Sequence, residues 1–413
     1  MNDPANPNTA PANALRTLSW SNLAAQSAEQ ISLAAVPIVA VMLLQAGPGE
    51  IGLLTAAQTL PFLLLSIPMG VLADRWSRSR LMVVAEGVRA LSLLALLLVV
   101  SGGSLSLAVL AVLGFIGAAG TVGFTVAAPA LVPALVPQHA LARANARLEL
   151  ARSAAFAAGP AVAGALVAWA GAGTAFVAAT VLSTLAALLL LRLPASPRAA
   201  GPARHVLDEL RHGAGLLWRD PLLRPVMWTA VVWNIAWFVL QAAYVPYAMR
   251  TLGLSADTVG FTLGCYGGGM LIGALLATRV TRVLPFGAAV LLGPLMSVLA
   301  AGAMLATLRW PTAWPAALSF VLFGAGPLVW TVTTTTLRQT LVPTRVLGQV
   351  SAMFLTVNAG ARPLGAALGG VVGSLWGETA CLVLAAVGFV LQALLISGSP
   401  VRVLRSLPAP VAP

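Results

Sequence analysis

Long apolar runs recur along this whole chain, and they constrain its fold more than any other feature. In hydrocarbon no water can satisfy backbone polar groups, so a membrane span of about 20 residues is a helix, and the alternative is a closed barrel of shorter strands. These runs are too long, and too continuously apolar, for barrel strands, which alternate apolar and polar residues. The sequence therefore predicts an all-α membrane protein with twelve transmembrane helices, at about 17–44, 50–72, 81–101, 105–130, 146–170, 173–194, 224–249, 254–278, 284–307, 312–335, 347–375 and 378–398.

The charges mark the two sides of the membrane. Only 8% of residues are charged, against roughly 25% in soluble proteins. All 23 basic residues are Arg, and most lie at the N-terminal end, in alternate connections or in the C-terminal tail. Only Arg250 and Arg309 lie in the opposite loops. Basic residues are enriched on the cytoplasmic side, so both termini are expected in the cytoplasm, and the net charge of +12 reports topology instead of a nucleic-acid partner.

The second half of the chain repeats the first. The segment 135–137, Leu-Val-Pro, recurs at 341–343 after the fourth span of each half. We therefore expect two six-helix bundles in parallel repeat. The predicted parts are an N-terminal cytoplasmic tail, a first bundle, a central cytoplasmic loop, a second bundle and a C-terminal cytoplasmic tail, at 1–16, 17–194, 195–223, 224–398 and 399–413. Within the loop, 205–218 has rough helical spacing, which fits a surface helix or a plain linker.

A short basic motif stands between the second and third spans. Residues 70–80 read Gly-Val-Leu-Ala-Asp-Arg-Trp-Ser-Arg-Ser-Arg, which resembles the G-x-L-a-D-R-x-G-R-K loop of the major facilitator superfamily, with departures at Ser77 and Ser79. In that family the loop docks against the start of helix 11 when the cytoplasmic side is closed. The resemblance implies conformational gating, and the alternative is a topology marker alone. The residues concerned are Gly70, Asp74, Arg75, Arg78 and Arg80.

Span 5 carries a second resemblance. Gly159, Pro160 and Gly164 match the G-P-x-x-G-G-x-L antiporter motif of the superfamily's exporters, with Ala163 as a departure. Small residues and proline also permit ordinary close packing and bending, which is the alternative. The connection 135–146 and the pair Glu86–Arg89 are similar to the drug and siderophore exporter branch related to the enterobactin exporter. Span 4, however, lacks the Arg that many proton-coupled drug antiporters keep.

These resemblances imply a secondary active transporter in the bacterial cytoplasmic membrane. The expected function is export of a hydrophobic or amphiphilic small molecule (a drug, natural product or siderophore) by alternating access, in exchange for protons. The expected partners are this substrate, the proton and the bilayer, with no cofactor and a monomeric state. Import of a small metabolite by the same fold is the alternative, and the span 5 motif favours export.

Polar residues within the first span suggest where a proton or substrate binds. Asn22, Gln26 and Glu29 follow helical spacing and share one face with Ser19. An intramembrane carboxylate is costly in lipid and tends to face the protein interior. By resemblance, helices 1, 4, 7 and 10 line the central cavity, so Glu29 is a candidate for binding substrate or a proton. The alternative is a structural carboxylate.

The second half and span 3 supply the remaining candidates. Arg362 and Asn358 lie one turn apart in span 11, where Arg362 can contact an anionic substrate, pair with Glu29 or bind backbone carbonyls. In span 7, Asn234, Trp237 and Gln241 combine aromatic area with amides, which suits an amphiphilic ligand. Trp is also common as an anchor at the membrane interface, although Trp237 lies too deep in its span for that role. Glu86 and Arg89 are expected to form a structural pair.

No enzymatic chemistry is indicated. The sequence contains no G-x-x-x-x-G-K-[ST] loop, nucleophile elbow or H-E-x-x-H motif, and its three His and two Cys show no metal-ligand spacing. We therefore expect neither an enzyme nor a metal site.

Overall fold

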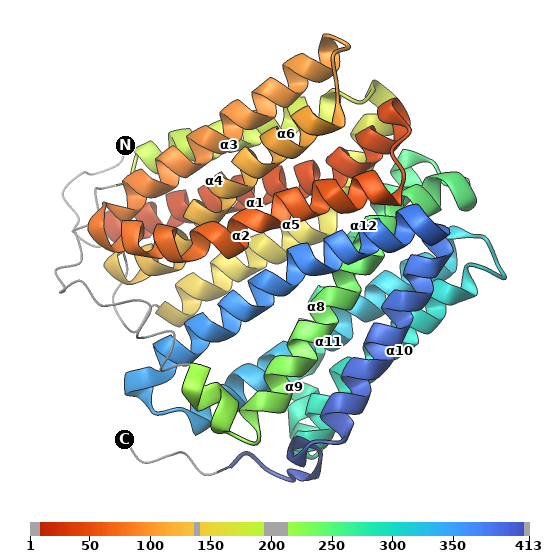
Figure 1. The fold of residues 1–413 in the computed structure, drawn as a ribbon. Coiled ribbons are helices and arrows are strands. Elements are labelled where there is room, and N and C mark those ends of the chain that lie inside the picture. The colour runs from red at the N-terminus through yellow and green to blue at the C-terminus, as the bar shows by residue number, and fades with distance from the viewer. Residues whose placement is uncertain (1–8, 136–140, 194–213, 409–413) are drawn as a thin grey trace. The chain divides into compact units, whose positions relative to one another are not determined.

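The computed structural model describes residues 9–135, 141–193 and 214–408, and every regular element in these ranges is helical (Figure 1). Eleven helices within the described residues are long and apolar enough to cross a membrane. The elements are α1 Thr9–Leu44, α2 Pro48–Arg75, α3 Arg78–Ser101, α4 Leu107–Leu135, α5 Leu141–Ala170, α6 Thr174–Leu191, α8 Leu223–Pro246, the π-helix η2 Tyr247–Thr251, α9 Ala256–Val283, α10 Phe286–Ala306, α11 Ala313–Leu341, α12 Thr344–Ser397 and the 3-10 helix η3 Pro400–Val403.

The longest of these helices is interrupted. α12 has 54 residues, which at 1.5 Å per residue would extend to about 80 Å, against a hydrocarbon thickness of about 30 Å. Gly377 breaks it with φ 79° and ψ 179°, a backbone conformation open to glycine alone. The chain reverses direction near this point (Figure 1). The sequence placed a boundary between two spans at 375–378, where the interruption lies.

Several helices continue beyond the predicted spans. α1 begins at Thr9, although the tail was expected to continue to residue 16. α2 ends at Arg75 and α3 begins at Arg78, so the motif at 70–80 is mostly helical, with a turn of two residues. The physical reason is that hydrogen bonding keeps a helix intact past the point where apolar residues stop.

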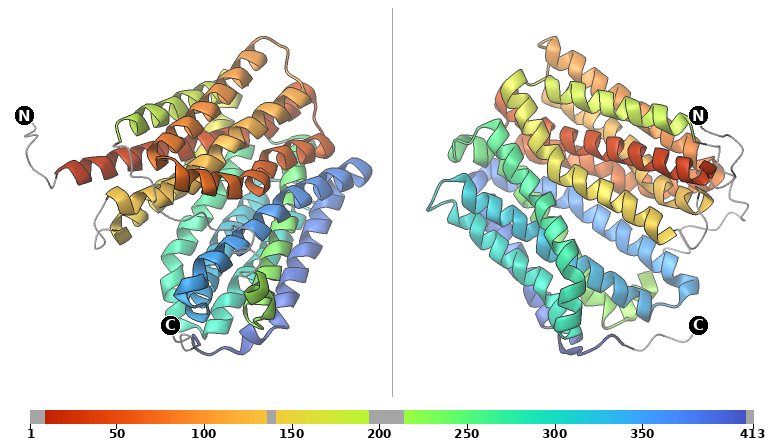
Figure 2. Two further views of the ribbon diagram at one scale, coloured as in Figure 1. Left: turned by 60° about the vertical axis from the view of Figure 1, so that its left-hand side comes forward. Right: turned by 180° about the vertical axis from the view of Figure 1, so that it is seen from behind.

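The first compact unit comprises Met1–Val39 and Leu60–Pro202. In it α3 packs against α4 and α6 (Figure 2), and a β-carbon added at Gly120 of α4 would lie 3.2 Å from Cβ of Arg89. That close approach brings polar groups of α3 and α4 within bonding distance. One cluster of its core is mainly aliphatic and includes Leu18, Met82, Phe124, Leu131 and Leu190.

The second unit comprises Ala40–Thr59 and Ala203–Pro413. In it α8 packs on α12, and α11 packs on both α9 and α10. The C-terminal segment is partly ordered instead of a plain tail, because η3 buries Val401 and the carbonyl of Leu404 accepts a 2.7 Å hydrogen bond from the amide of Gly287. The end of the central loop is helical at 214–219 and buries Leu217 against α8. The preceding part of the predicted loop, 195–213, lies outside the described residues.

Residues 40–59 group with the second compact unit. Glycines allow this grouping, because a β-carbon added at Gly52 would lie 2.6 Å from the backbone nitrogen of Gly370 and 2.7 Å from the carbonyl oxygen of Ala366. In the same region Arg250 donates a hydrogen bond to the carbonyl of Gln45. Backbone contact of this kind requires residues without side chains.

Equivalent bonds join equivalent helices in the two units. The hydroxyl of Ser92 in α3 donates to the carbonyl of Leu113 in α4 at 2.5 Å. The hydroxyl of Ser319 in α11 donates to the carbonyl of Ala300 in α10 at 2.7 Å. Ser319 lies 206 residues after Leu113, which is the offset of the repeat. The α3–α4 pair and the α10–α11 pair are therefore joined by the same type of bond, with the donor and acceptor helices exchanged.

Candidate functional site

A buried polar cluster lies within the first unit and is centred on Arg89 of α3. The guanidinium donates to the carboxylate of Glu86 at 2.6 Å and to the backbone carbonyl of Ala25 in α1 at 2.8 Å. It also donates to the hydroxyls of Thr121 in α4 at 3.3 Å and Ser183 in α6 at 3.4 Å. The predicted Glu86–Arg89 pair is confirmed, and four helices supply its partners.

Glu29 approaches the same arginine from α1. Its carboxylate lies 3.9 Å from Nη1 of Arg89, and its side chain is 17% exposed, whereas that of Glu86 is fully buried. We call Glu29, Glu86, Arg89, Thr121 and Ser183 the Arg89 cluster. One carboxylate in it is sealed in the protein, and the other retains access to its surroundings.

The cluster places two carboxylates beside one guanidinium. Counted over these three side chains alone, its charge is −1 when both carboxylates are ionised and zero when one holds a proton. Glu86 Oε2 accepts bonds from Arg89 and, at 2.8 Å, from Ser183, while Oε1 is buried without a hydrogen-bond partner among the described residues. A buried carboxylate is costly at low dielectric, so the ionised form of Glu86 depends on these donors.

The other polar residues of the α1 stripe have different surroundings. Asn22 is buried, and its amide donates to the carbonyl of Leu148 in α5 at 3.1 Å. Ser19 donates to the carbonyl of Leu15 on its own helix. Gln26 is half-buried, one turn before Glu29. The stripe thus holds α1 against α5 at its start and reaches the Arg89 cluster at Glu29.

The second unit contains an amide pair instead of charges. The amide of Asn234 in α8 donates to the side-chain oxygen of Asn358 in α12 at 3.1 Å, and each amide also donates to a carbonyl of its own helix. Arg362 lies one turn beyond Asn358 and is half-buried. Within the first unit Glu29 lies 3.9 Å from Arg89, and its pairing with Arg362, which belongs to the other unit, stays a prediction.

Aromatic rings surround Trp237 in the same unit. Its ring stacks on Trp233 at 5.4 Å between centroids and lies 5.0 Å from Tyr266 and 5.2 Å from Phe323. Trp237 is only 8% exposed, so most of its surface belongs to the core. Gln241, one turn later, is half-buried and leaves an amide beside this aromatic group.

The residues of the motif at 70–80 differ in their exposure to solvent. Arg75 and Arg80 are exposed, Arg78 and Gly70 are half-buried, and the side chain of Asp74 lies outside the described residues.

In α5, Gly159, Pro160 and Gly164 are buried, and a β-carbon added at Gly159 would lie 2.5 Å from Cβ of Gln30. Gly159 therefore allows α1 and α5 to touch within the first unit.

Thr121 and Ser183 were not anticipated from the sequence. A lone hydroxyl in an apolar span is usually bonded to its own helix, so neither residue gives a distinctive signal. Ser183 is separated from Glu86 by 97 residues, and only the packing of α6 on α3 brings them together. The described residues contain no group of three or more His, Cys, Asp or Glu placed to hold a metal ion.

Comparisons with known proteins agree on the family. The model of the Major Facilitator Superfamily matches residues 18–366. The enterobactin exporter EntS of Shigella boydii serotype 18 is 27% identical over 310 residues, which cover 74% of this chain and 72% of the exporter. The EntS protein of Escherichia coli O81 is equally similar.

Solved transporters share the fold. The nucleoside transporter NupG superposes with a TM-score of 0.73 at 13% identity and covers 93% of this chain and 97% of its own. A D-xylose-proton symporter gives 0.70 at 17% identity, with 94% and 97% covered. These likenesses, with the eleven membrane-length helices, identify a multi-pass protein of the cell membrane. The chain belongs to the Major Facilitator Superfamily and is similar over most of its length to enterobactin exporters.

Proposed function

We propose that this protein exports a hydrophobic or amphiphilic small molecule in exchange for protons, by alternating access. The direction of transport is supported by the 27% identity to enterobactin exporters and by the Gly159-Pro160 motif of α5. The proposed topology has twelve spans, counting α12 as two helices that meet at Gly377, with both termini in the cytoplasm. Nothing in this proposal requires a cofactor or a second copy of the chain.

The Arg89 cluster is the observation that supports proton coupling. Glu29 is partly exposed inside a membrane-spanning helix and lies 3.9 Å from an arginine already bonded to Glu86. Protonation of Glu29 would remove one negative charge beside Arg89 and leave the guanidinium to its remaining partners. A change in that charge can bias the equilibrium between the two conformations of alternating access, because these conformations differ in how well they solvate the charge.

Substrate binding is proposed for the aromatic and amide groups of the second unit. Trp237 and Gln241 of α8 present ring area beside an amide, and Asn234, one turn before Trp237, is bonded to Asn358 of α12. Such a mixture suits an amphiphile, because rings contribute contact area and amides fix orientation. Arg362 adds a positive charge for an anionic substrate group.

Proton-driven export is tested with purified protein in proteoliposomes. An imposed pH gradient should drive uptake of a fluorescent amphiphile into inside-out liposomes, and a protonophore should abolish it. Glu29→Gln should bind the amphiphile but lose the response to the gradient. Glu149→Gln is the matched control, because Glu149 is an exposed carboxylate paired with Arg152 at 2.6 Å. A full response to the pH gradient in Glu29→Gln would exclude Glu29 as the coupling site. Movement of the amphiphile out of the inside-out liposomes would favour import over export.

A further inference from the structure

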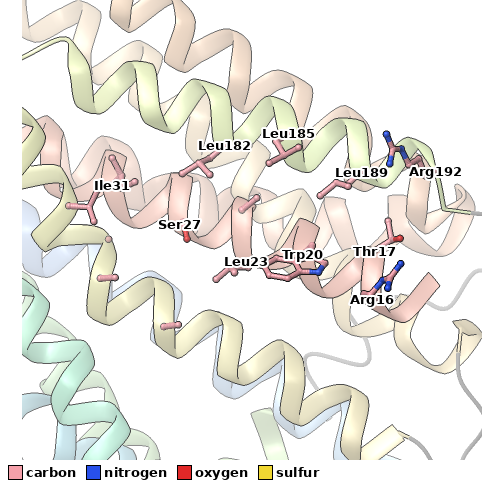
Figure 3. Close-up of a pocket in the computed structure, with 15 residues that line it drawn as sticks. Arg16, Thr17, Trp20, Leu23, Ser27, Ile31, Leu182, Leu185, Leu189 and Arg192 are labelled. Atoms are coloured by element: carbon pink, nitrogen blue, oxygen red, sulfur yellow. The ribbon is translucent and has the colours of Figure 1, made fainter. Parts of the chain in front are cut away.

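An open apolar groove lies on the first unit. It has a volume of about 980 Å³ and is formed by α1, α5 and α6 (Figure 3). Leu23 and Ile31 of α1 and Leu182, Leu185 and Leu189 of α6 line it, with Val162 on the α5 side. The groove therefore offers hydrocarbon contact along most of its length.

One end of the groove is basic. Arg16 of α1 and Arg192, which follows α6, both line it and lie together at the same end in Figure 3, next to Thr17. Both arginines are exposed, and neither takes part in the ion pairs of Arg89 and Arg152 found within the described residues. Two exposed guanidinium groups beside a threonine hydroxyl match a phosphate group in charge and hydrogen bonding.

The dimensions match one leaflet of a bilayer. Arg16 and Ile31 are 15 residues apart, which is about 22 Å along a helix, and half a bilayer with its headgroup region is about 20–22 Å. Trp20 lies one turn inside Arg16 and is 59% exposed, which is typical of a side chain at the membrane interface.

The groove opens on a surface that faces acyl chains. α6 exposes Val177, Val181 and Leu188 beside the groove residue Leu185, each more than 40% exposed. An exposed aliphatic surface of this size on a membrane-spanning helix is covered by lipid. A ligand that enters the groove from this side is thus already in the bilayer.

We infer that the groove between α1, α5 and α6 binds an anionic phospholipid, with its phosphate on Arg16 and Arg192 and an acyl chain along Leu23, Leu185 and Ile31. The charge of the two arginines favours an anionic over a zwitterionic headgroup, because no acidic side chain lines the groove to receive an amine. The site is independent of the proposed export, since it uses none of the residues assigned to proton or substrate.

Native mass spectrometry of the purified full-length protein tests this site. The protein in detergent is titrated with dioleoyl phosphatidylglycerol, dioleoyl phosphatidylcholine or glycerol 3-phosphate. Arg16→Gln/Arg192→Gln should weaken phosphatidylglycerol binding by about thirtyfold, at roughly a fivefold loss for each arginine. Arg279→Gln/Arg282→Gln removes two exposed arginines of α9 and the same net charge, and should leave the affinity unchanged.

A second variant separates loss of the site from loss of folding. Ala158 is exposed and lines the groove, so Ala158→Trp fills it while both arginines remain. This variant should also lose phosphatidylglycerol binding and stay monodisperse. The proposal would be overturned if phosphatidylcholine bound as tightly as phosphatidylglycerol. It would also be overturned if the Arg279/Arg282 control variant lost as much affinity as the Arg16/Arg192 variant, or if Ala158→Trp bound phosphatidylglycerol unchanged. Glycerol 3-phosphate binding as tightly as the lipid would show a simple anion site and would also contradict it.

Discussion

Replacing Arg89 should be among the most destabilising single changes in the first unit. The side chain is 4% exposed and makes four hydrogen bonds, to Glu86, Ala25, Thr121 and Ser183. Arg89→Met keeps much of the apolar volume but removes every one of these donors. It leaves the Glu86 carboxylate fully buried, with Ser183 as its remaining hydrogen-bond donor among the described side chains.

The expected cost follows from the stranded charge. Removing one partner of a buried ion pair costs about 3–5 kcal/mol, because the other charge loses its compensation. In a unit of this size each kcal/mol corresponds to roughly 2–4 °C in the unfolding midpoint. Arg89→Met should therefore lower that midpoint by about 6–20 °C. Thermal unfolding in detergent, followed by the loss of monodisperse protein on size-exclusion chromatography, measures this shift.

The double variant Glu86→Leu/Arg89→Met provides the decisive comparison. Replacing both charges by apolar groups of similar volume is often neutral, so the double variant should be more stable than Arg89→Met alone. The interaction term of the mutant cycle should reach at least about 2 kcal/mol. If the double variant is as unstable as the sum of the two single variants, Glu86 and Arg89 are not coupled and the electrostatic reasoning fails.

Three further changes test other contacts. Gly52→Ala should destabilise the protein by about 1–3 kcal/mol, because its β-carbon meets the backbone of Gly370, while Gly268→Ala, which has open space, should have little effect in the same thermal assay. Asp74→Asn should slow transport in proteoliposomes without abolishing ligand binding, and an unchanged rate would argue against gating. Asn358→Leu should cost about 1–3 kcal/mol by leaving the Asn234 amide short of an acceptor, and adding Asn234→Leu should recover part of that loss.

The helical fold and the approximate placement of the spans could be read from the sequence, because bilayer thickness sets the length of a spanning helix. The break at Gly377 was also predictable, since an apolar stretch of more than 50 residues cannot cross once. Helix ends were predicted less well: α2 continues to Arg75, because backbone hydrogen bonding does not stop where hydropathy falls. The grouping of 40–59 with the second unit depends on the contact between Gly52 and Gly370, which are distant in sequence.

The candidate site was predictable only in part. Glu86 and Arg89 are one turn apart, so their pairing follows from helical geometry. Glu29 was identified by the cost of a carboxylate in lipid, but its approach to Arg89 depends on how α1 packs on α3. The aromatic setting of Trp237 likewise comes from residues of α9 and α11 that no local pattern connects.

Comparison of the two units separates what the fold needs from what function adds. In the first unit a buried bond joins α3 to α6, from Arg89 to Ser183. In the second unit Gln392 of α12 donates to the carbonyl of Pro294 in α10 at 3.3 Å. Pro294 lies 205 positions after Arg89, and Gln392 lies 209 positions after Ser183. The repeat thus conserves the position of an interhelical bond but not its charge.

A neutral amide is therefore sufficient to join these two helices. The ion pair of the first unit costs more desolvation than the bond in the second unit, for the same connection. Joining the two helices therefore does not require the charges of Glu86 and Arg89. These charges lie beside Glu29, whose carboxylate is partly exposed. Glu86→Leu/Arg89→Met should accordingly fold but transport without response to a pH gradient, and a coupled response in that stable variant would show that the charges serve the fold alone.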